Sequence, residues 1–279
     1  MARFSIGVII DSFRTDTVTA VKKAAACGAQ GIQVYATTGE MAPENMNPKK
    51  IAEFRDLVAS NGLVVSALCG DLGGGFTNPE ENPARIEKSK RILDLAKEIG
   101  TDIVTTHIGV VPADKNHDRY KVMQEACYEL AHYADTIDAH FAVETGPETS
   151  AVLKEFLDSL DSTGVSVNLD PANLVMVTGD DPAGAVINLQ KYIVHTHAKD
   201  GKQLFYRDPE IVYGLVKDPL VTGRSFLEVP LGEGSVPWDR YLDALESIGY
   251  KGFLTIEREV GDDPERDIKA AVSFLKERI

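Results

Sequence analysis

Short apolar runs alternate with helix-type patterns along the whole chain. Eight apolar runs have the length and composition of β-strands, and they occupy residues 4–10, 31–36, 63–69, 102–109, 140–146, 165–170, 192–200 and 252–259. Between them, apolar side chains recur every three or four positions, as over residues 17–28, 83–100 and 120–137. A last helix is predicted over residues 265–279. The chain therefore repeats one strand–helix unit.

This order of elements predicts a closed barrel. Strands that alternate with helices run parallel, because each crossover helix returns the chain to the same end of the sheet. Eight such units in 279 residues match an α/β fold of the (β/α)8 TIM-barrel type, with residues 1–279 as a single domain. An open doubly wound sheet would place a glycine-rich phosphate-binding turn after its first strand, and "VIIDSFRTD" contains no such turn.

One connection, residues 201–236, is much longer than the others. It contains Phe205, Tyr206, Tyr213 and Phe226, an aromatic content that argues against disorder. It follows the seventh strand, on the face where barrel enzymes keep their active sites. We therefore interpret it as a loop that could cover a substrate as a lid.

The last four predicted strands carry polar side chains on alternate positions. In "VHTHAKD", His195, His197 and Lys199 share one face while the small and apolar residues between them take the other. The apolar face must contact the helices, so the polar face points into the barrel. The same alternation places Glu144, Asp170 and Glu257 inside, at the carboxyl ends of their strands; we expect these three to lie close to His197.

Three carboxylates cannot share a buried site without compensation, because like charges in a low dielectric repel strongly. A divalent cation bound by Glu144, Asp170, His197 and Glu257 would remove most of that cost. Oxygen ligands with one imidazole suit Mn²⁺, our first choice, with Mg²⁺, Co²⁺ or Zn²⁺ as alternatives. The sequence thus predicts a metal site.

Other residues near these ligands have two interpretations each. His107 faces inward near the end of its strand and either contacts substrate or packs. His195 lies one pleat deeper than His197, where a supporting role competes with substrate contact. Lys199 is either a cation that faces substrate or the partner of Asp200. Arg258 and Glu259 are interpreted as parts of surface ion pairs, although Glu259 shares the inward face of Glu257.

Composition narrows the class of partner. A net charge of −14 argues against nucleic acid, whose phosphates demand a basic surface. Three cysteines without a CxxC pair indicate reduced thiols, and no apolar run approaches a signal peptide or a membrane span. We expect a cytoplasmic protein, with no membrane partner, that acts on a small molecule and could form a homo-oligomer.

Taken together, these motifs resemble the sugar phosphate isomerase/epimerase family of xylose-isomerase-like TIM barrels. The resemblance covers essentially the whole chain and rests on "VETG", "NLDPAN", "HTHAKD", "PLGEGSVPW" and "GFLTIERE". It implies that Glu144, Asp170, His197 and Glu257 hold a divalent metal, on which adjacent oxygens of a carbohydrate substrate are bound.

Such binding acidifies the C–H between those oxygens, since the cation stabilises the developing enediolate. We therefore expect a sugar or sugar phosphate isomerase or epimerase, with Glu144 and Glu257 as acid and base. Asn173 and Lys199 stand where ketose 3-epimerases of the family usually carry His and Arg, and "HAKD" also resembles inosose dehydratases. An inosose-type or keto-sugar dehydratase is thus one alternative, and a catalytically silent sugar-binding barrel is another. Asn173, Lys199, His107 and His195 are the expected substrate-binding residues.

Overall fold

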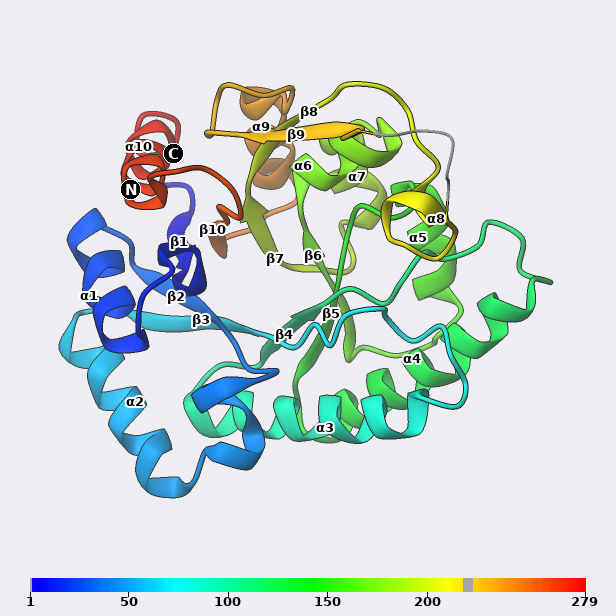
Figure 1. Cartoon of the computed structure of the whole chain (residues 1–279), viewed down its shortest axis with the longest axis horizontal. Helices are drawn as coiled ribbons and strands as arrows, with labels where there is room; N and C mark the ends of the chain where they lie inside the picture. Colours follow the sequence, from blue (N-terminus) through cyan, green and yellow to red (C-terminus); the bar gives the residue numbers. More distant parts are fainter. Residues whose placement is uncertain (1, 218–222) are drawn as a thin grey trace.

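Eight parallel strands close on themselves in the order β1-β10-β7-β6-β5-β4-β3-β2 (Figure 1). The structure is a computed structural model that describes residues 2–217 and 223–279. The barrel strands are β1 (Ser5–Ile9), β2 (Gly31–Tyr35), β3 (Val64–Cys69), β4 (Ile103–Thr106), β5 (His140–Glu144), β6 (Val165–Leu169), β7 (Ile193–Ala198) and β10 (Phe253–Ile256). Each lies within one of the eight predicted ranges. The prediction of a (β/α)8 TIM barrel is confirmed.

Helices surround the barrel (Figure 1). The longer ones are α1 (Thr17–Cys27), α2 (Pro48–Ser60), α3 (Asn82–Ile99), α4 (Asp118–Thr136), α5 (Ser150–Asp158), α7 (Pro182–Leu189), α9 (Trp238–Ser247) and α10 (Pro264–Lys276). Short turns complete the connections: η1 (Ile10–Phe13), η2 (Gly39–Met41), η3 (Pro43–Asn45), α6 (Pro171–Asn173) and η4 (Leu174–Thr178). Over residues 2–217 and 223–279, none of the helices combines the length and apolar character needed to cross a membrane.

Alternation along each strand separates a packing face from a polar face. In β5, Phe141 and Val143 are fully buried in the apolar core shared with the helices, while Glu144 points into the barrel. The register aligns the polar faces of neighbouring strands: Glu144 of β5 pairs with Asn168 of β6, and His197 of β7 pairs with Thr255 of β10. Inward side chains of successive strands therefore meet at the same height.

The long connection after β7 contains regular structure. Strands β8 (Asp200–Gln203) and β9 (Phe226–Val229) form an antiparallel hairpin, with α8 (Pro209–Val212) between them (Figure 1). Of the stretch interpreted as a lid, residues 218–222 lie outside the described residues. Asp200 accepts hydrogen bonds from the Gly232 and Val236 amides and from the Trp238 indole, so it anchors the hairpin and does not pair with Lys199.

Candidate metal centre

Four buried side chains meet at the carboxyl ends of adjacent barrel strands. Glu144, Asp170, His197 and Glu257 each offer a ligand atom, and these atoms lie within 4.8 Å of one another. Nδ1 of His197 is 3.5 Å from Glu144 Oε1, 3.5 Å from Asp170 Oδ2 and 3.3 Å from Glu257 Oε2. This is the grouping that strand alternation predicted.

One oxygen of the cluster has no hydrogen-bond partner. Asp170 Oδ1 accepts from the Ala172 and Asn173 amides and thereby caps α6, whereas the buried Oδ2 faces His197 without a hydrogen bond. Burial raises the pKa of Asp170 above its ordinary value. An orphaned carboxylate oxygen beside two more carboxylates and an imidazole fits a divalent cation, which would supply the missing partner.

The electrostatics of the cluster also favour added positive charge. Burial alone opposes a charged imidazole, yet the carboxylates of Glu144 and Glu257 raise the pKa of His197 well above its ordinary value. Burial likewise opposes ionisation of Glu257, but Lys199 and His197 lower the pKa of that carboxyl below its ordinary range. Neighbouring positive charge thus favours the ionised form of Glu257, and also of Glu144, where burial opposes ionisation but His107 and His197 lower the pKa of the carboxyl.

A network behind the ligands fixes their orientation. Asn168 Nδ2 donates to Glu144 Oε2 at 3.1 Å, while Asn168 Oδ1 lies 2.9 Å from Nδ1 of His195. Nε2 of His195 lies 2.9 Å from the Thr255 hydroxyl. Burial lowers the pKa of His195 well below its ordinary value, so the ring is neutral, and its two nitrogens connect Asn168 to Thr255.

His195 therefore holds the network in place and is not among the residues that line the cavity. The expectation of substrate contact is revised to a positioning role, because the one-pleat offset puts this ring below the cavity floor. Asn173 does line the cavity, and its Nδ2 donates to Glu144 Oε1 at 3.1 Å.

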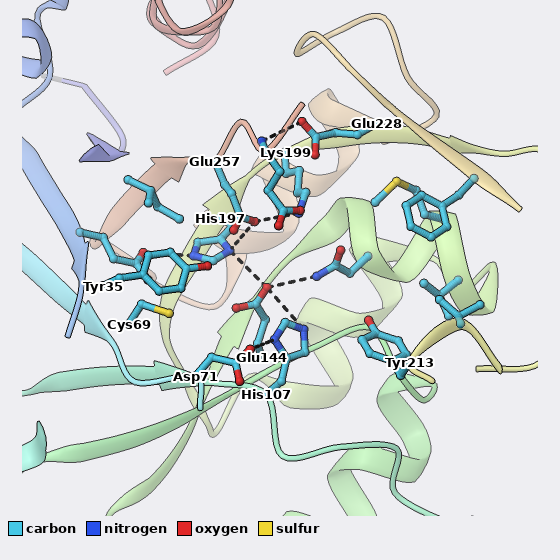
Figure 2. Close-up of a pocket in the computed structure, with 18 residues that line it drawn as sticks. Tyr35, Cys69, Asp71, His107, Glu144, His197, Lys199, Tyr213, Glu228 and Glu257 are labelled. Atoms are coloured by element: carbon cyan, nitrogen blue, oxygen red, sulfur yellow. Dashed lines mark hydrogen bonds and ion pairs between the residues drawn. The ribbon is translucent and has the colours of Figure 1, made fainter. Parts of the chain in front are cut away.

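Two cationic groups stand on opposite sides of the cluster (Figure 2). Lys199 Nζ donates to Glu257 Oε2 at 3.0 Å and also to Glu259. His107 Nδ1 lies 3.2 Å from Asp71 Oδ2, and its Nε2 lies 3.8 Å from Glu144 Oε1. Burial disfavours charge on His107, but Glu144 and Asp71 raise its pKa to about 9.

A cavity of about 220 Å³ opens directly above the cluster. The connection after β7 covers one side of it with Val212, Tyr213 and Phe226, and the Tyr213 ring lies 5.8 Å from that of His107. An ion pair between Arg119 of α4 and Glu210 of α8 ties this cover to the barrel. That the connection after β7 opens and closes over a substrate as a lid stays a prediction.

The hairpin is also tied to the segment after β10 that carries Glu257. Arg258 donates to Glu228 Oε1 of β9 at 2.6 Å and to Asp267 Oδ2 of α10 at 3.0 Å, and all three side chains are buried. The interpretation of Arg258 as a surface ion pair is therefore wrong. Its partner Glu228 comes from the hairpin, a contact that local sequence does not reveal.

Sequence reasoning missed several cavity residues. Gln33 is the polar residue on an otherwise apolar strand, and its Oε1 lies 3.1 Å from His197 Nε2. Asp71 follows the end of β3, as Asp170 and Glu257 follow the ends of β6 and β10, but it lies in the glycine-rich stretch 70–75, where no strand alternation gives a direction. Tyr213 and Glu228 come from the long connection, where no periodicity marks a direction.

The family model described as xylose isomerase-like TIM barrel matches residues 21–278. The chain belongs to this family. The resemblance expected from the motifs is thereby confirmed.

Curated relatives of this xylose isomerase-like barrel are distant. An uncharacterised protein of Methanocaldococcus jannaschii is 23% identical over 253 residues, which cover 86% of this chain and 76% of that protein. Inosose dehydratase 2 of Bacillus cereus is 28% identical over 155 residues, covering 53% of this chain and 46% of that enzyme. The match thus spans about half the length of either protein.

Solved structures share the fold over the whole chain. A xylose isomerase domain protein from Planctomyces limnophilus has a TM-score of 0.79 at 24% identity, covering 99% of this chain and 96% of that one. The probable 3-DHS dehydratase AsbF of Bacillus anthracis gives 0.77 at 19% identity, with 99% and 100% coverage. D-psicose 3-epimerase of Clostridium cellulolyticum gives 0.73 at 16% identity, with 99% coverage of both chains. Epimerases and dehydratases are thus both built on this fold.

Proposed function

We propose that this chain is a divalent-metal-dependent enzyme that moves a proton on the carbon beside a carbohydrate carbonyl, as an isomerase or epimerase. The observation that carries the proposal is the placement of Glu144 and Glu257 on either side of His197, at the floor of the cavity. Glu144, Asp170, His197 and Glu257 would hold the ion, with Mn²⁺ as first choice. The ion would supply stabilisation of negative charge on the substrate's oxygens.

The chain's own residues supply the proton transfers. Glu144 ends β5 and Glu257 follows β10, so their carboxylates approach the cavity from different sides. One removes the proton and the other returns it. Return to the neighbouring carbon gives an isomerase, and return to the opposite face of the same carbon gives an epimerase. Lys199, Asn173 and His107 would orient the substrate's oxygens.

A dehydratase that acts on a keto-cyclitol or keto-sugar is the second candidate. It is favoured by the Asp71–His107 pair, since an imidazolium held by a carboxylate can protonate a departing hydroxyl. The curated match to inosose dehydratases supports the same reading. A silent sugar-binding barrel would keep the metal and the substrate contacts and catalyse no exchange.

The test is mass spectrometry of ketoses, keto-sugars and inososes incubated in D₂O with Mn²⁺-loaded protein. Gain of deuterium at unchanged composition supports the isomerase or epimerase. Loss of one water supports the dehydratase. Metal-dependent binding without either change would point to the silent barrel.

A further inference from the structure

The cavity is lined by acidic side chains. Its carboxylates come from five residues: Asp71, Glu144, Glu228, Glu257 and Glu259. Among the described residues that line it, Lys199 is the one lysine and there is no arginine. A phosphate monoester carries a charge of about −1.5 to −2 at neutral pH, so these carboxylates would repel it.

The two cationic groups of the cavity are already engaged. Lys199 Nζ lies between Glu257 and Glu259, and it donates to both. His107 lies between Asp71 and Glu144. Each cation thus faces two carboxylates, and a phosphate would have to displace one of them.

The nearby arginines point elsewhere. The Arg258 guanidinium donates to Glu228 and Asp267, and Arg119 donates to the Val110 carbonyl and to Glu210. Lys202 and Arg224 are exposed. In the sequence, residues 218–222 read "DPLVT" and so contain no basic side chain.

We infer that the cavity takes an uncharged polyhydroxylated substrate, a keto-sugar or keto-cyclitol without phosphate or carboxylate, and that Glu228 and Glu259 exclude anionic ones. The inference rests on the proposed function. The carboxylates of the cavity and of Asp170 outnumber the positive charges even with a divalent ion bound, with Lys199 and His107 charged, and with Arg258 counted beside Glu228. Hydroxyl groups, in contrast, can donate hydrogen bonds to these carboxylates.

Isothermal titration calorimetry on the full, Mn²⁺-loaded chain tests this inference. The probes are ketohexoses and keto-cyclitols, each compared with its own phosphate monoester, with retention of Mn²⁺ checked by EPR. We expect the neutral compound of a pair to bind at least about 100-fold more tightly than its phosphate ester. A phosphate ester that binds as tightly as its neutral partner overturns the inference. Failure of both the neutral compounds and their phosphate esters to bind would also overturn it.

Charge-removal variants test the two glutamates. Glu259→Gln alters a side chain that is 57% exposed, so the fold is expected to tolerate it; Glu228→Gln is the buried counterpart. Each should improve the affinity for the phosphate ester relative to its neutral partner about tenfold. Glu125→Gln, on an exposed position of α4, should leave that ratio unchanged. An unchanged ratio in Glu259→Gln would contradict the role given to these residues.

Binding and turnover separate this inference from the proposed function. Neutral compounds that bind without exchange of deuterium or loss of water would contradict the proposed catalysis and leave the charge preference standing. Phosphate esters that bind and exchange deuterium would contradict the charge preference and leave the proposed catalysis standing.

Discussion

Oε1 of Gln33 lies 3.1 Å from Nε2 of His197, although β1 and β10 separate their strands in the barrel order. With an ion bound, this acceptor would favour the proton on Nε2 and leave Nδ1, which faces the three carboxylates, to hold the ion, although Asn168 Nδ2 also lies 3.1 Å from Nε2. Gln33 is itself held, because its Nε2 donates to the Thr105 hydroxyl at 2.8 Å. The orientation of a predicted ligand thus depends on a residue from the opposite half of the chain.

Gln33→Met should weaken metal binding about 10- to 100-fold, since the imidazole loses the acceptor that fixes its tautomer. Titration with Mn²⁺ followed by EPR measures the change. Gln190→Met, at an exposed position, is the matched control. If Gln33→Met binds Mn²⁺ as tightly as the wild type, Gln33 does not help to orient His197 for metal binding.

Removal of metal should destabilise the fold. An ion present at 100 times its Kd stabilises the folded state by about 2.7 kcal/mol, which corresponds to roughly 5 to 10 °C in Tm for a chain of this size. Differential scanning calorimetry with chelator and after Mn²⁺ is restored measures the shift. In Asp170→Asn, most of this difference in Tm between the metal-loaded and the chelated protein should disappear. An identical Tm with and without chelator would argue strongly against the site.

Glu257→Gln should reduce turnover far more than metal binding. Loss of a proton-transfer group costs typically 10²- to 10⁴-fold, while the amide oxygen can still reach the ion. Deuterium exchange measures the first quantity and EPR titration the second. Glu233→Gln, an exposed glutamate, serves as control. Parallel losses in both quantities would show that Glu257 acts as a ligand alone.

Glu148 should make stability fall as pH rises. Its Oε2 accepts from the Val111 amide, its buried Oε1 has no partner, and burial raises its pKa to about 8. The unfolded value is about 4.3, so between about pH 4.5 and 8 the folded state keeps a proton that the unfolded state has released. This group therefore lowers the free energy of unfolding by about 1.4 kcal/mol per pH unit across that window.

Glu148→Gln should remove that slope. Urea unfolding of the chelated protein at pH 5, 6, 7 and 8 gives the free energy of unfolding of both forms, and their difference should grow towards pH 8. Glu125→Gln should retain the wild-type slope. A constant difference between wild type and Glu148→Gln would mean that Glu148 is ionised throughout the range.

Arg258→Leu should destabilise the fold by about 3 to 5 kcal/mol, because it removes the buried cation shared by the carboxylates of Glu228 and Asp267 and leaves Asp267 with the exposed Arg266 alone. Urea denaturation measures the loss. Arg240→Ala breaks an exposed pair with Asp181 and should cost less than about 1 kcal/mol. Equal, small costs for the two variants would mean that water reaches the Arg258 cluster.

The sequence predicted the ligand cluster because two simple regularities act together. Side chains alternate between the faces of a strand, and parallel strands end on the same face of a barrel. Glu144, Asp170, His197 and Glu257 follow from these alone. The same regularities place His195 one pleat deeper than His197 but leave open whether substrate reaches it, and in the structure its ring joins Asn168 to Thr255 and does not line the cavity.

Contacts that depend on the path of a connection could not be predicted. Glu228 reaches Arg258 only because β8 and β9 pair into a hairpin over the end of the barrel. Tyr213 reaches His107 because α8 returns towards α4. Neither contact can be recognised from periodicity in the sequence, since both depend on packing between distant segments.

The two halves of the barrel supply different parts of the site. The four candidate ligands come from the ends of β5, β6, β7 and β10, which are neighbours in the barrel. Gln33, Tyr35, Asp71 and His107 come from β2, β3 and β4 and the segments that follow them. In chain order the first candidate ligand is residue 144, so the opening half of the polypeptide lines the cavity but supplies none of the four. A chimaera joined before β5 would therefore exchange Gln33, Tyr35, Asp71 and His107 as one set, while the four candidate ligands, Glu228 and Glu259 would stay together in the second half.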